Sequence, residues 1–160
     1  MAALRDMGVS VGVAGNQTSR AGEILRQLDL PADLIVTSED CRASKPDQSF
    51  FRALISAAPC EAGRIVYVGD RLDNDLQPAN AAGMRTAFIR RGPWGYIWEH
   101  HPDMAAAADW RMTVASERRA ASRTEGTRSA PRLTCAATTS CNCAEGTAQY
   151  MCRCAVVTEM

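Results

Sequence analysis

The sequence predicts an α/β fold, a Rossmann-like parallel sheet with helices on both faces. Short apolar runs rich in β-branched residues alternate with amphipathic segments four times between residues 8 and 89. The runs are apolar throughout, as expected of parallel strands that are buried on both faces. Polar clusters follow three of the runs, where ligands bind in such sheets, beyond the carboxyl ends of the strands. The alternation, the apolar runs and the clusters together indicate this fold class.

The first half of the pattern begins with a buried strand in the sequence GVSVGVA, residues 8–14. The turn residues GNQTS follow, and Ser19 is expected to cap a helix that runs to about Leu28. A second strand is expected at Leu34 to Thr37, which reads LIVT. The inward face of the first helix is expected to carry Ala21, Ile24, Leu25 and Leu28.

The second half of the pattern begins with a helix after Pro46. The third strand, IVYV, covers Ile65 to Val68 and ends abruptly at a Gly-Asp pair. A helix from about Asp75 to Ala82 follows, and Thr86 to Ile89 forms the fourth strand. The helix after Pro46 is expected to turn inward Phe50, Phe51, Leu54 and Ile55.

Composition limits the class of protein. A length of 160 residues suits one globular domain, and a formal net charge of zero does not favour a nucleic-acid partner or an anionic membrane. No apolar run approaches the roughly 20 residues of a membrane helix. The N-terminal sequence MAALRDMG lacks the apolar core of a signal peptide. A cytoplasmic protein is therefore expected.

The chain changes character after about Thr113. Residues 1–115 are expected to form the core domain, and residues 116–160 a low-complexity, disordered tail rich in Arg, Ser, Thr and Cys. Two CxC pairs in the tail invite a zinc or copper(I) site, but structural zinc sites more often use CxxC knuckles in a folded frame. An unstructured or frame-altered tail is the preferred interpretation. The tail cysteines are Cys135, Cys141, Cys143, Cys152 and Cys154.

Two carboxylates follow the third strand. Asp70 closes the strand in the sequence VYVGDRLDND, and Asp75 comes five residues later, on the opening turn of a helix. Mg²⁺ binds a few carboxylate oxygens together with waters and substrate phosphate, so these two acids can form a magnesium site. Asp73 and Asn74 are weaker candidates. The alternative is that Asp73 and Asp75 only cap and charge the helix N-terminus.

Lys45 is the only lysine among 18 basic residues, and it lies between a strand and Pro46. An ammonium group fixed there can neutralise phosphate or an acyl-phosphate intermediate as a point charge. The alternative is an exposed lysine in a loop. The sequence therefore makes Lys45 a candidate for both catalysis and phosphate binding.

The cluster VAGNQTS lies between the first strand and the first helix. Backbone N–H groups of Gly15 and Asn16 can bind phosphate oxygens there, helped by the side chains of Asn16, Gln17 or Thr18. A purely structural turn is equally compatible with the cluster. His100 and His101 follow the aromatic stretch WGYIW and are assigned to a surface loop rather than to catalysis.

In this order and at these spacings, the three clusters resemble motifs two, three and four of the haloacid dehalogenase-like (HAD-like) hydrolase superfamily. The strongest matches are SKPD with the aromatic pair Phe50 and Phe51, and VGDRLDNDLQPANAAGM, which resembles the GDxxxxD motif of the family. The resemblance covers about residues 2–113 and so the C-terminal part of the core domain. It implies phosphoryl transfer to an aspartate, followed by hydrolysis of the aspartyl phosphate with Mg²⁺ present.

The resemblance also implies roles for the candidate residues. Lys45 would bridge the nucleophile and the phosphate, Asp70 would help to hold Mg²⁺, and Asp75 would support the metal or the lysine. Asn16 matches the residue that often follows the hydroxyl of the second motif. Gly15 stands where the family usually has that hydroxyl, so the phosphate contact must come from the backbone, from a neighbouring side chain, or be absent.

The sequence departs most from the family in lacking a DxDxT-like segment. The first strand, its nucleophilic aspartate and any N-terminal cap domain are therefore expected to be missing. That strand lies between the strands of motifs two and four, so its loss predicts two unpaired inner edges in the sheet. The isolated chain is expected to be an inactive fragment.

The sequence thus predicts a HAD-like hydrolase of a Mg²⁺-dependent phosphatase lineage, with a small phosphorylated metabolite as substrate. Self-association or a complementing N-terminal segment is the expected protein partner. One alternative is a non-catalytic remnant or binding module that acts through another chain. A receiver domain shares the parallel sheet and the acidic site, but its N-terminal acidic pair and phosphoacceptor aspartate are absent.

Overall fold

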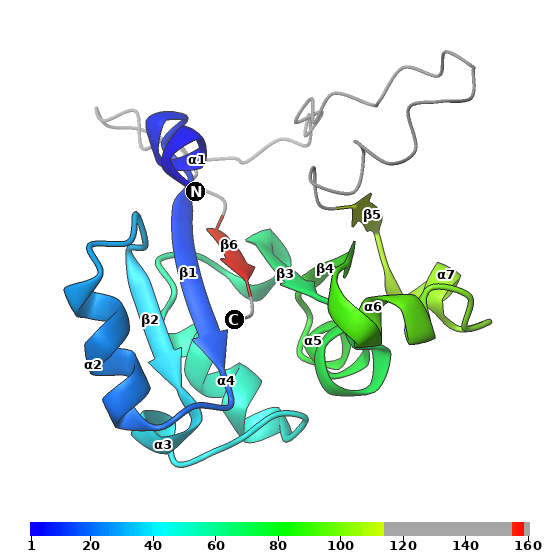
Figure 1. The fold of residues 1–160 in the computed structure, drawn as a ribbon, viewed down its shortest axis with the longest axis horizontal. Helices are drawn as coiled ribbons and strands as arrows, with labels where there is room; N and C mark the ends of the chain where they lie inside the picture. Colours follow the sequence, from blue (N-terminus) through cyan, green and yellow to red (C-terminus); the bar gives the residue numbers. More distant parts are fainter. Residues whose placement is uncertain (114–154, 159–160) are drawn as a thin grey trace, which may run out of the picture.

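The computed structural model describes residues 1–113 and 155–158, which form a six-stranded parallel sheet with helices around it (Figure 1). The strand order is β2-β1-β6-β3-β4-β5, and every neighbouring pair is parallel. The strands are β1 (Ser10–Gly15), β2 (Leu34–Thr37), β3 (Ile65–Gly69), β4 (Arg85–Arg90), β5 (Trp110–Thr113) and β6 (Ala155–Thr158). The helices are α1 (Ala2–Asp6), α2 (Ser19–Gln27), α3 (Ser38–Cys41), α4 (Gln48–Ala57), the 3₁₀ helix η1 (Ala62–Arg64), the π-helix η2 (Leu72–Leu76), α5 (Gln77–Ala81), α6 (Gly92–Trp98) and α7 (Met104–Ala107).

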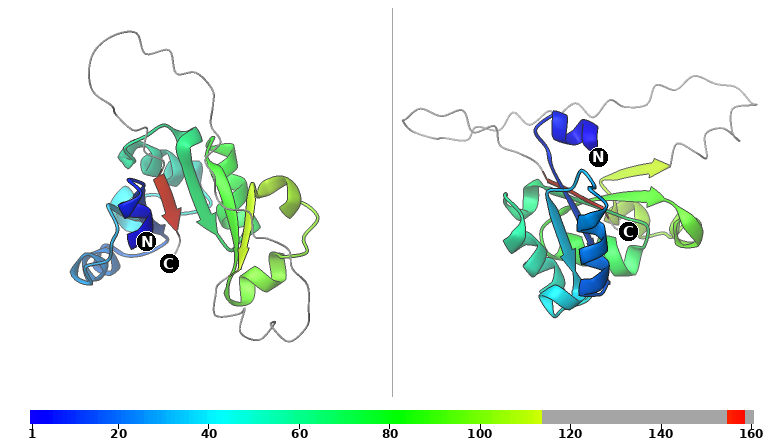
Figure 2. Two further views of the ribbon diagram at one scale, coloured as in Figure 1. Left: turned by 90° about the horizontal axis from the view of Figure 1, so that it is seen from above. Right: turned by 60° about the vertical axis from the view of Figure 1, so that its left-hand side comes forward.

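Helices lie on both faces of the sheet, and the predicted α/β class is confirmed. In the right-hand view of Figure 2, α4 and α2 lie on opposite sides of β1 and β2. One core cluster joins α4 and α5 to the strands, and a second joins η2, β4 and α7. The first comprises Ala14, Val36, Phe50, Phe51, Leu54, Ile65, Tyr67, Ala79 and Met84, and the second Leu72, Leu76, Phe88, Met104 and Ala107. Within residues 1–113 and 155–158, no helix combines the length and the hydropathy that a membrane span requires.

The first helix differs from the prediction in its cap and in its inward face. Thr18, not Ser19, is the N-cap of α2, and its Oγ1 accepts a hydrogen bond from the backbone N–H of Ala21 at 3.3 Å. The buried residues of α2 are Gly22 and Leu25, whereas Ile24 and Leu28, which were predicted to face the core, are 45% and 61% exposed. A Cβ on Gly22 would lie 2.9 Å from the side chain of Thr37, so the helix approaches β2 through its glycine.

The aromatic stretch WGYIW forms helix α6, which was not predicted from the sequence, whereas His100 and His101 follow it outside the helix, as expected. The helix packs closely against β4, because a Cβ on Gly95 would lie 3.0 Å from the backbone of Arg90. Two glycines and a proline over Gly92–Trp98 obscure the helical pattern in the sequence, since both residue types are poor helix formers. Close packing on the strand stabilises a helix here that local propensity does not predict.

The centre of the sheet is the largest departure from the prediction. Two unpaired inner edges were expected between β1 and β3, but Ala155–Thr158 occupies that position as β6. This segment was expected to belong to a tail outside the core. It is short and β-branched, and pairing with it satisfies ladder groups on both flanking strands. The rest of the expected tail, residues 116–154 and 159–160, lies outside the described residues, and so do residues 114 and 115 of the expected core and the tail cysteines.

Candidate active site

The candidate residues lie beyond the carboxyl ends of parallel strands. Asn16 directly follows β1, and Asp70 directly follows β3. Lys45 lies in the loop between α3 and α4, and α3 directly follows the end of β2. Because these strands are parallel, their carboxyl ends share one edge of the sheet.

Asn16 holds the backbone of Lys45 through two hydrogen bonds. Its side-chain Oδ1 accepts from the Lys45 N–H at 2.7 Å, and its Nδ2 donates to the Lys45 carbonyl at 3.0 Å. Only a carboxamide offers a donor and an acceptor side by side in this way. In this structure Asn16 is therefore a residue that positions the lysine.

The Lys45 ammonium forms an ion pair with Asp75 in the interior of the protein. Lys45 Nζ lies 2.7 Å from Asp75 Oδ1, and both side chains are 0% exposed. The other oxygen, Asp75 Oδ2, accepts from the Arg71 backbone N–H at 3.1 Å, while Asn74 Nδ2 lies 3.4 Å from Oδ1. Both carboxylate oxygens thus have donors. Asp75 thus orients the lysine. Its contacts go beyond the alternative considered from the sequence, in which Asp75 only caps the N-terminus of a helix.

Two backbone features bring Asp75 against the end of β3. It lies on the π-helix η2, a geometry that is rare and frequent at functional sites. A Cβ on Gly69 would lie 2.4 Å from the Asp75 Cβ and 2.8 Å from its Cγ. Any larger residue at position 69 would push Asp75 away from Lys45. The sequence showed this glycine only as the end of a strand, and its steric role depends on the fold.

Asp70 lies closer to solvent than Asp75. Its side chain is 14% exposed, and Arg91 Nε lies 3.9 Å from its Oδ2. Arg91 precedes α6, so the helix that the sequence missed also brings a guanidinium to the site. Asp70 is therefore a partly accessible carboxylate beside a positive charge.

Asp73 belongs to a surface ion pair. Arg71 donates to both of its carboxylate oxygens, from Nε at 3.1 Å and from Nη2 at 2.7 Å. These hydrogen bonds hold the pKa of Asp73 below its usual value of 3.8, partly opposed by burial. The same guanidinium lies over the ring of Trp94, 4.4 Å from its centroid. Asp73 is thus engaged on the surface rather than beside Asp75.

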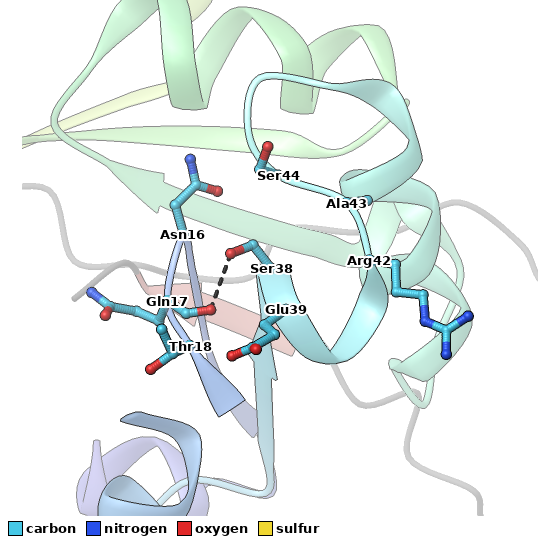
Figure 3. A pocket seen from close by; sticks show the side chains of 8 residues that line it. All are labelled: Asn16, Gln17, Thr18, Ser38, Glu39, Arg42, Ala43 and Ser44. Carbon is cyan, nitrogen blue, oxygen red and sulfur yellow. Dashed lines mark hydrogen bonds between the residues drawn. The ribbon is translucent and has the colours of Figure 1, made fainter. Parts of the chain in front are cut away.

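A cleft of about 470 Å³ opens beside Asn16 (Figure 3). The Thr18 hydroxyl on its wall caps α2, and the Gln17 carbonyl accepts from Ser38 Oγ at 3.0 Å. Helix α3, which the sequence did not predict, supplies Ser38 and closes the cleft opposite the GNQTS turn. The lining residues are Asn16, Gln17, Thr18, Ser38, Glu39, Arg42, Ala43 and Ser44.

The structure brings only some of the predicted site residues into contact. Hydrogen bonds join Asn16, Lys45 and Asp75. Gln17 and Thr18 line the cleft next to Asn16, whereas Lys45 and Asp70 are not among its lining residues. A Cβ on Gly15 would meet only the Gln17 side chain, at 3.7 Å, so the backbone there leaves room for a hydroxyl-bearing residue.

Comparison with known proteins supports the resemblance. A family profile described as HAD-hydrolase-like matches residues 42–109. Glyceraldehyde 3-phosphate phosphatase from Methanocaldococcus jannaschii is 35% identical over 94 residues, which cover 57% of this chain and 41% of that protein. Haloacid dehalogenase-like hydrolase domain-containing protein 3 from Danio rerio is 33% identical over 87 residues, 53% of this chain and 36% of that protein. The chain thus spans about two-fifths of the length of these relatives.

Two solved structures share the fold. A HAD phosphatase from Thermococcus onnurineus matches with a TM-score of 0.54 and 29% identity, over 74% of this chain and 53% of that one. The HAD-hydrolase YfnB from Bacillus subtilis, described as bound to magnesium, matches with a TM-score of 0.53 over 72% of this chain and 50% of that one. At 19% identity, the second match shows the fold alone. Profile, relatives and structures agree that the chain is similar to HAD-like hydrolases, and the profile match covers residues 42–109.

Proposed function

We propose that this chain is the phosphate- and magnesium-binding part of the core of a Mg²⁺-dependent phosphatase that acts on a small phosphorylated metabolite. The observation that carries the proposal is the buried Lys45–Asp75 ion pair at the carboxyl edge of the sheet, close in sequence to Asp70. Burying two charges costs desolvation energy that their attraction often fails to recover, so such a pair is weak evidence for stability. Strongly buried, partnered charges near a cleft favour a functional site.

Lys45 is proposed to neutralise the negative charge of the transferring phosphoryl group. Its backbone is fixed by Asn16 and its ammonium by Asp75, so the charge is positioned before a substrate arrives. Because the Lys45 side chain is fully buried, a phosphate reaches its Nζ only when that atom becomes accessible from solvent. Gly15, Gln17 and Thr18 are proposed to add phosphate contacts from the turn after β1.

Asp70 is proposed to hold Mg²⁺. Its carboxylate is partly exposed at a strand end, and Mg²⁺ needs only one or two carboxylates when waters and substrate phosphate supply the remaining ligands. No group of three or more metal-ligating side chains gathers within the described residues, which suits a site that the substrate completes. The ion would supply charge neutralisation at the phosphate. Asp75, with both oxygens engaged, supports the lysine in preference to the metal.

The attacking carboxylate is proposed to come from a segment that this sequence does not contain. The family chemistry passes through an aspartyl phosphate, and no DxDxT-like segment is present. Asp73 does not replace it, because Arg71 binds both of its oxygens. We therefore propose residues 1–115 as a partial core domain, in which the other elements of the site are assembled without the nucleophile.

The test is an assay of the full chain with Mg²⁺ and p-nitrophenyl phosphate. We expect no turnover above the background of a mock purification, and the same rate for Asp70→Asn. Without the covalent step only electrostatic stabilisation remains. Turnover by the chain that disappears in Asp70→Asn but persists in the exposed control Asp103→Asn would show that the chain carries its own nucleophile.

A further inference from the structure

The two halves of the sheet meet only through β6 in the part of the chain that the structure describes. There β1 pairs with β2 and β6, and β3 pairs with β4 and β6. Figure 1 shows β6 between these strands, although it comes from the far end of the sequence. A segment that follows β5 by more than forty residues thus completes the sheet at its centre.

The place that β6 occupies in the sheet can be filled only by an extended strand. Its four residues pair in parallel with Ser10 to Val13 of β1 and with Ile65 to Val68 of β3. Without a strand there, both flanking strands would present unpaired N–H and C=O groups toward each other, which is costly away from water. The position therefore needs an extended segment, and β-branched residues suit it.

Strand β6 is also shorter than the two strands that flank it. β1 is six residues long and β3 five, whereas the described β6 has four. Additional residues of a competing strand add ladder hydrogen bonds to the two neighbours in turn. What favours β6 is its covalent link to β5 through residues 114–154, since attachment makes its pairing with β1 and β3 intramolecular.

We propose that the slot between β1 and β3 is a strand-acceptor site, held by the chain's own residues Ala155–Thr158. An extended, β-branched segment of another polypeptide, running parallel to β1, enters the slot only by displacing β6. The protein partner of this chain is thus a strand donor, and β6 is the intramolecular competitor that excludes it. Strand pairing at this slot uses backbone groups and does not depend on any catalytic activity.

The first experiment is amide hydrogen exchange on the full, unmodified chain. Successive amides of a strand point to opposite neighbours, so a filled slot protects consecutive amides in β1 and β3. An empty slot leaves every second amide unprotected, as at a sheet edge. We expect continuous protection across Ser10–Gly15 and Ile65–Gly69. Alternating protection in both strands would overturn the proposal.

The second experiment removes β6 from the slot with Val157→Pro, and Val157→Ile is the matched control. Val157 pairs with Gly12 and Tyr67, and a proline in a central strand cannot donate to the ladder. We expect amide exchange in β1 and β3 to accelerate at least tenfold, with β4 changed less than twofold. The control should match the wild type. Unchanged exchange in β1 and β3 would overturn the proposal.

The third experiment asks whether the emptied slot takes a strand from outside. A fluorescently labelled AVVTEM peptide, residues 155–160, should bind Val157→Pro at least tenfold more tightly than the wild type, by fluorescence anisotropy. Equal affinity for the two proteins, or binding to neither, would contradict a β6-filled slot. If the proline variant loses protection in β4 as well, excess unlabelled peptide should restore it, and failure to do so counts against the proposal. A stable wild-type dimer with the same protection would overturn the intrachain assignment.

Discussion

At the scale of single residues, the site depends on one buried charge pair. The sequence singled out Lys45 because it is the only lysine, and Asp75 because of its spacing from Asp70. Sequence could not show that Asn16 would clamp the lysine backbone, or that Gly69 leaves room for Asp75. Both facts depend on which segments the fold brings together, and neither has a local pattern.

Removing one partner of this pair should destabilise the protein strongly. We expect Lys45→Met to lower the free energy of unfolding by about 3–5 kcal/mol, because Asp75 would remain as a buried charge without its ammonium partner. The double variant Lys45→Met/Asp75→Leu should cost less than the single one, since no charge is left unpaired. Urea denaturation measures both.

The control for this prediction is the exposed pair Arg20–Glu23, whose side chains are 77% and 57% exposed. Arg20→Ala should change the free energy of unfolding by less than about 1 kcal/mol, because water screens the pair. If Lys45→Met costs no more than Arg20→Ala, or if the double variant costs more than the single, the account of a costly buried pair is wrong.

At the scale of elements, local signals predicted those that carry them. Helix α4 begins shortly after Pro46, as predicted, and buries Phe50, Phe51 and Leu54. Strand β2 has its predicted bounds. Helix α3 has only four residues, too few to show a period of 3.6, and it was missed. Gln77–Ala81 continues the predicted helix after Asp75, but its first turn is a π-helix that propensity does not reveal.

The N-terminus of α4 should depend on pH through Asp47. Its Oδ1 accepts from the Ser49 backbone N–H at 3.0 Å, and that bond holds the pKa of Asp47 below its usual value of 3.8. A lowered folded-state pKa stabilises the fold above 3.8, and this stabilisation is lost as the pH falls through the lowered value. Asp47→Ala should therefore lower the melting temperature at pH 7 and leave it unchanged once the pH is below the folded-state pKa.

The matched variant for this helix is Asp47→Ser, which keeps a side-chain acceptor at the N-cap but does not titrate. Its melting temperature at pH 7 should lie between those of the wild type and Asp47→Ala, with less pH dependence than the wild type. Thermal melts monitored by circular dichroism between pH 2 and 7 make the comparison. A constant difference between wild type and Asp47→Ala across this range would contradict the assignment.

At the scale of the whole molecule, alternation along the sequence predicted the sheet but not its centre. Strands β1 to β4 each follow from a local apolar run, and their parallel order follows from the helices between them. The pairing of β6 joins segments from opposite ends of the sequence. Periodicity within a window carries no information about such a pairing, and the composition around Ala155–Thr158 resembles that of a solvated tail.

The proposed magnesium site depends on Asp70, which lies between β3 and the π-helix that carries Asp75. Isothermal titration of the full chain with MgCl₂ measures this binding, with Asp70→Asn as the variant and Asp103→Asn as the exposed control. Circular dichroism first confirms that all three proteins are folded. We predict weak, saturable binding by the wild type and by Asp103→Asn, and none by Asp70→Asn. The same binding isotherm for all three proteins would contradict the claim.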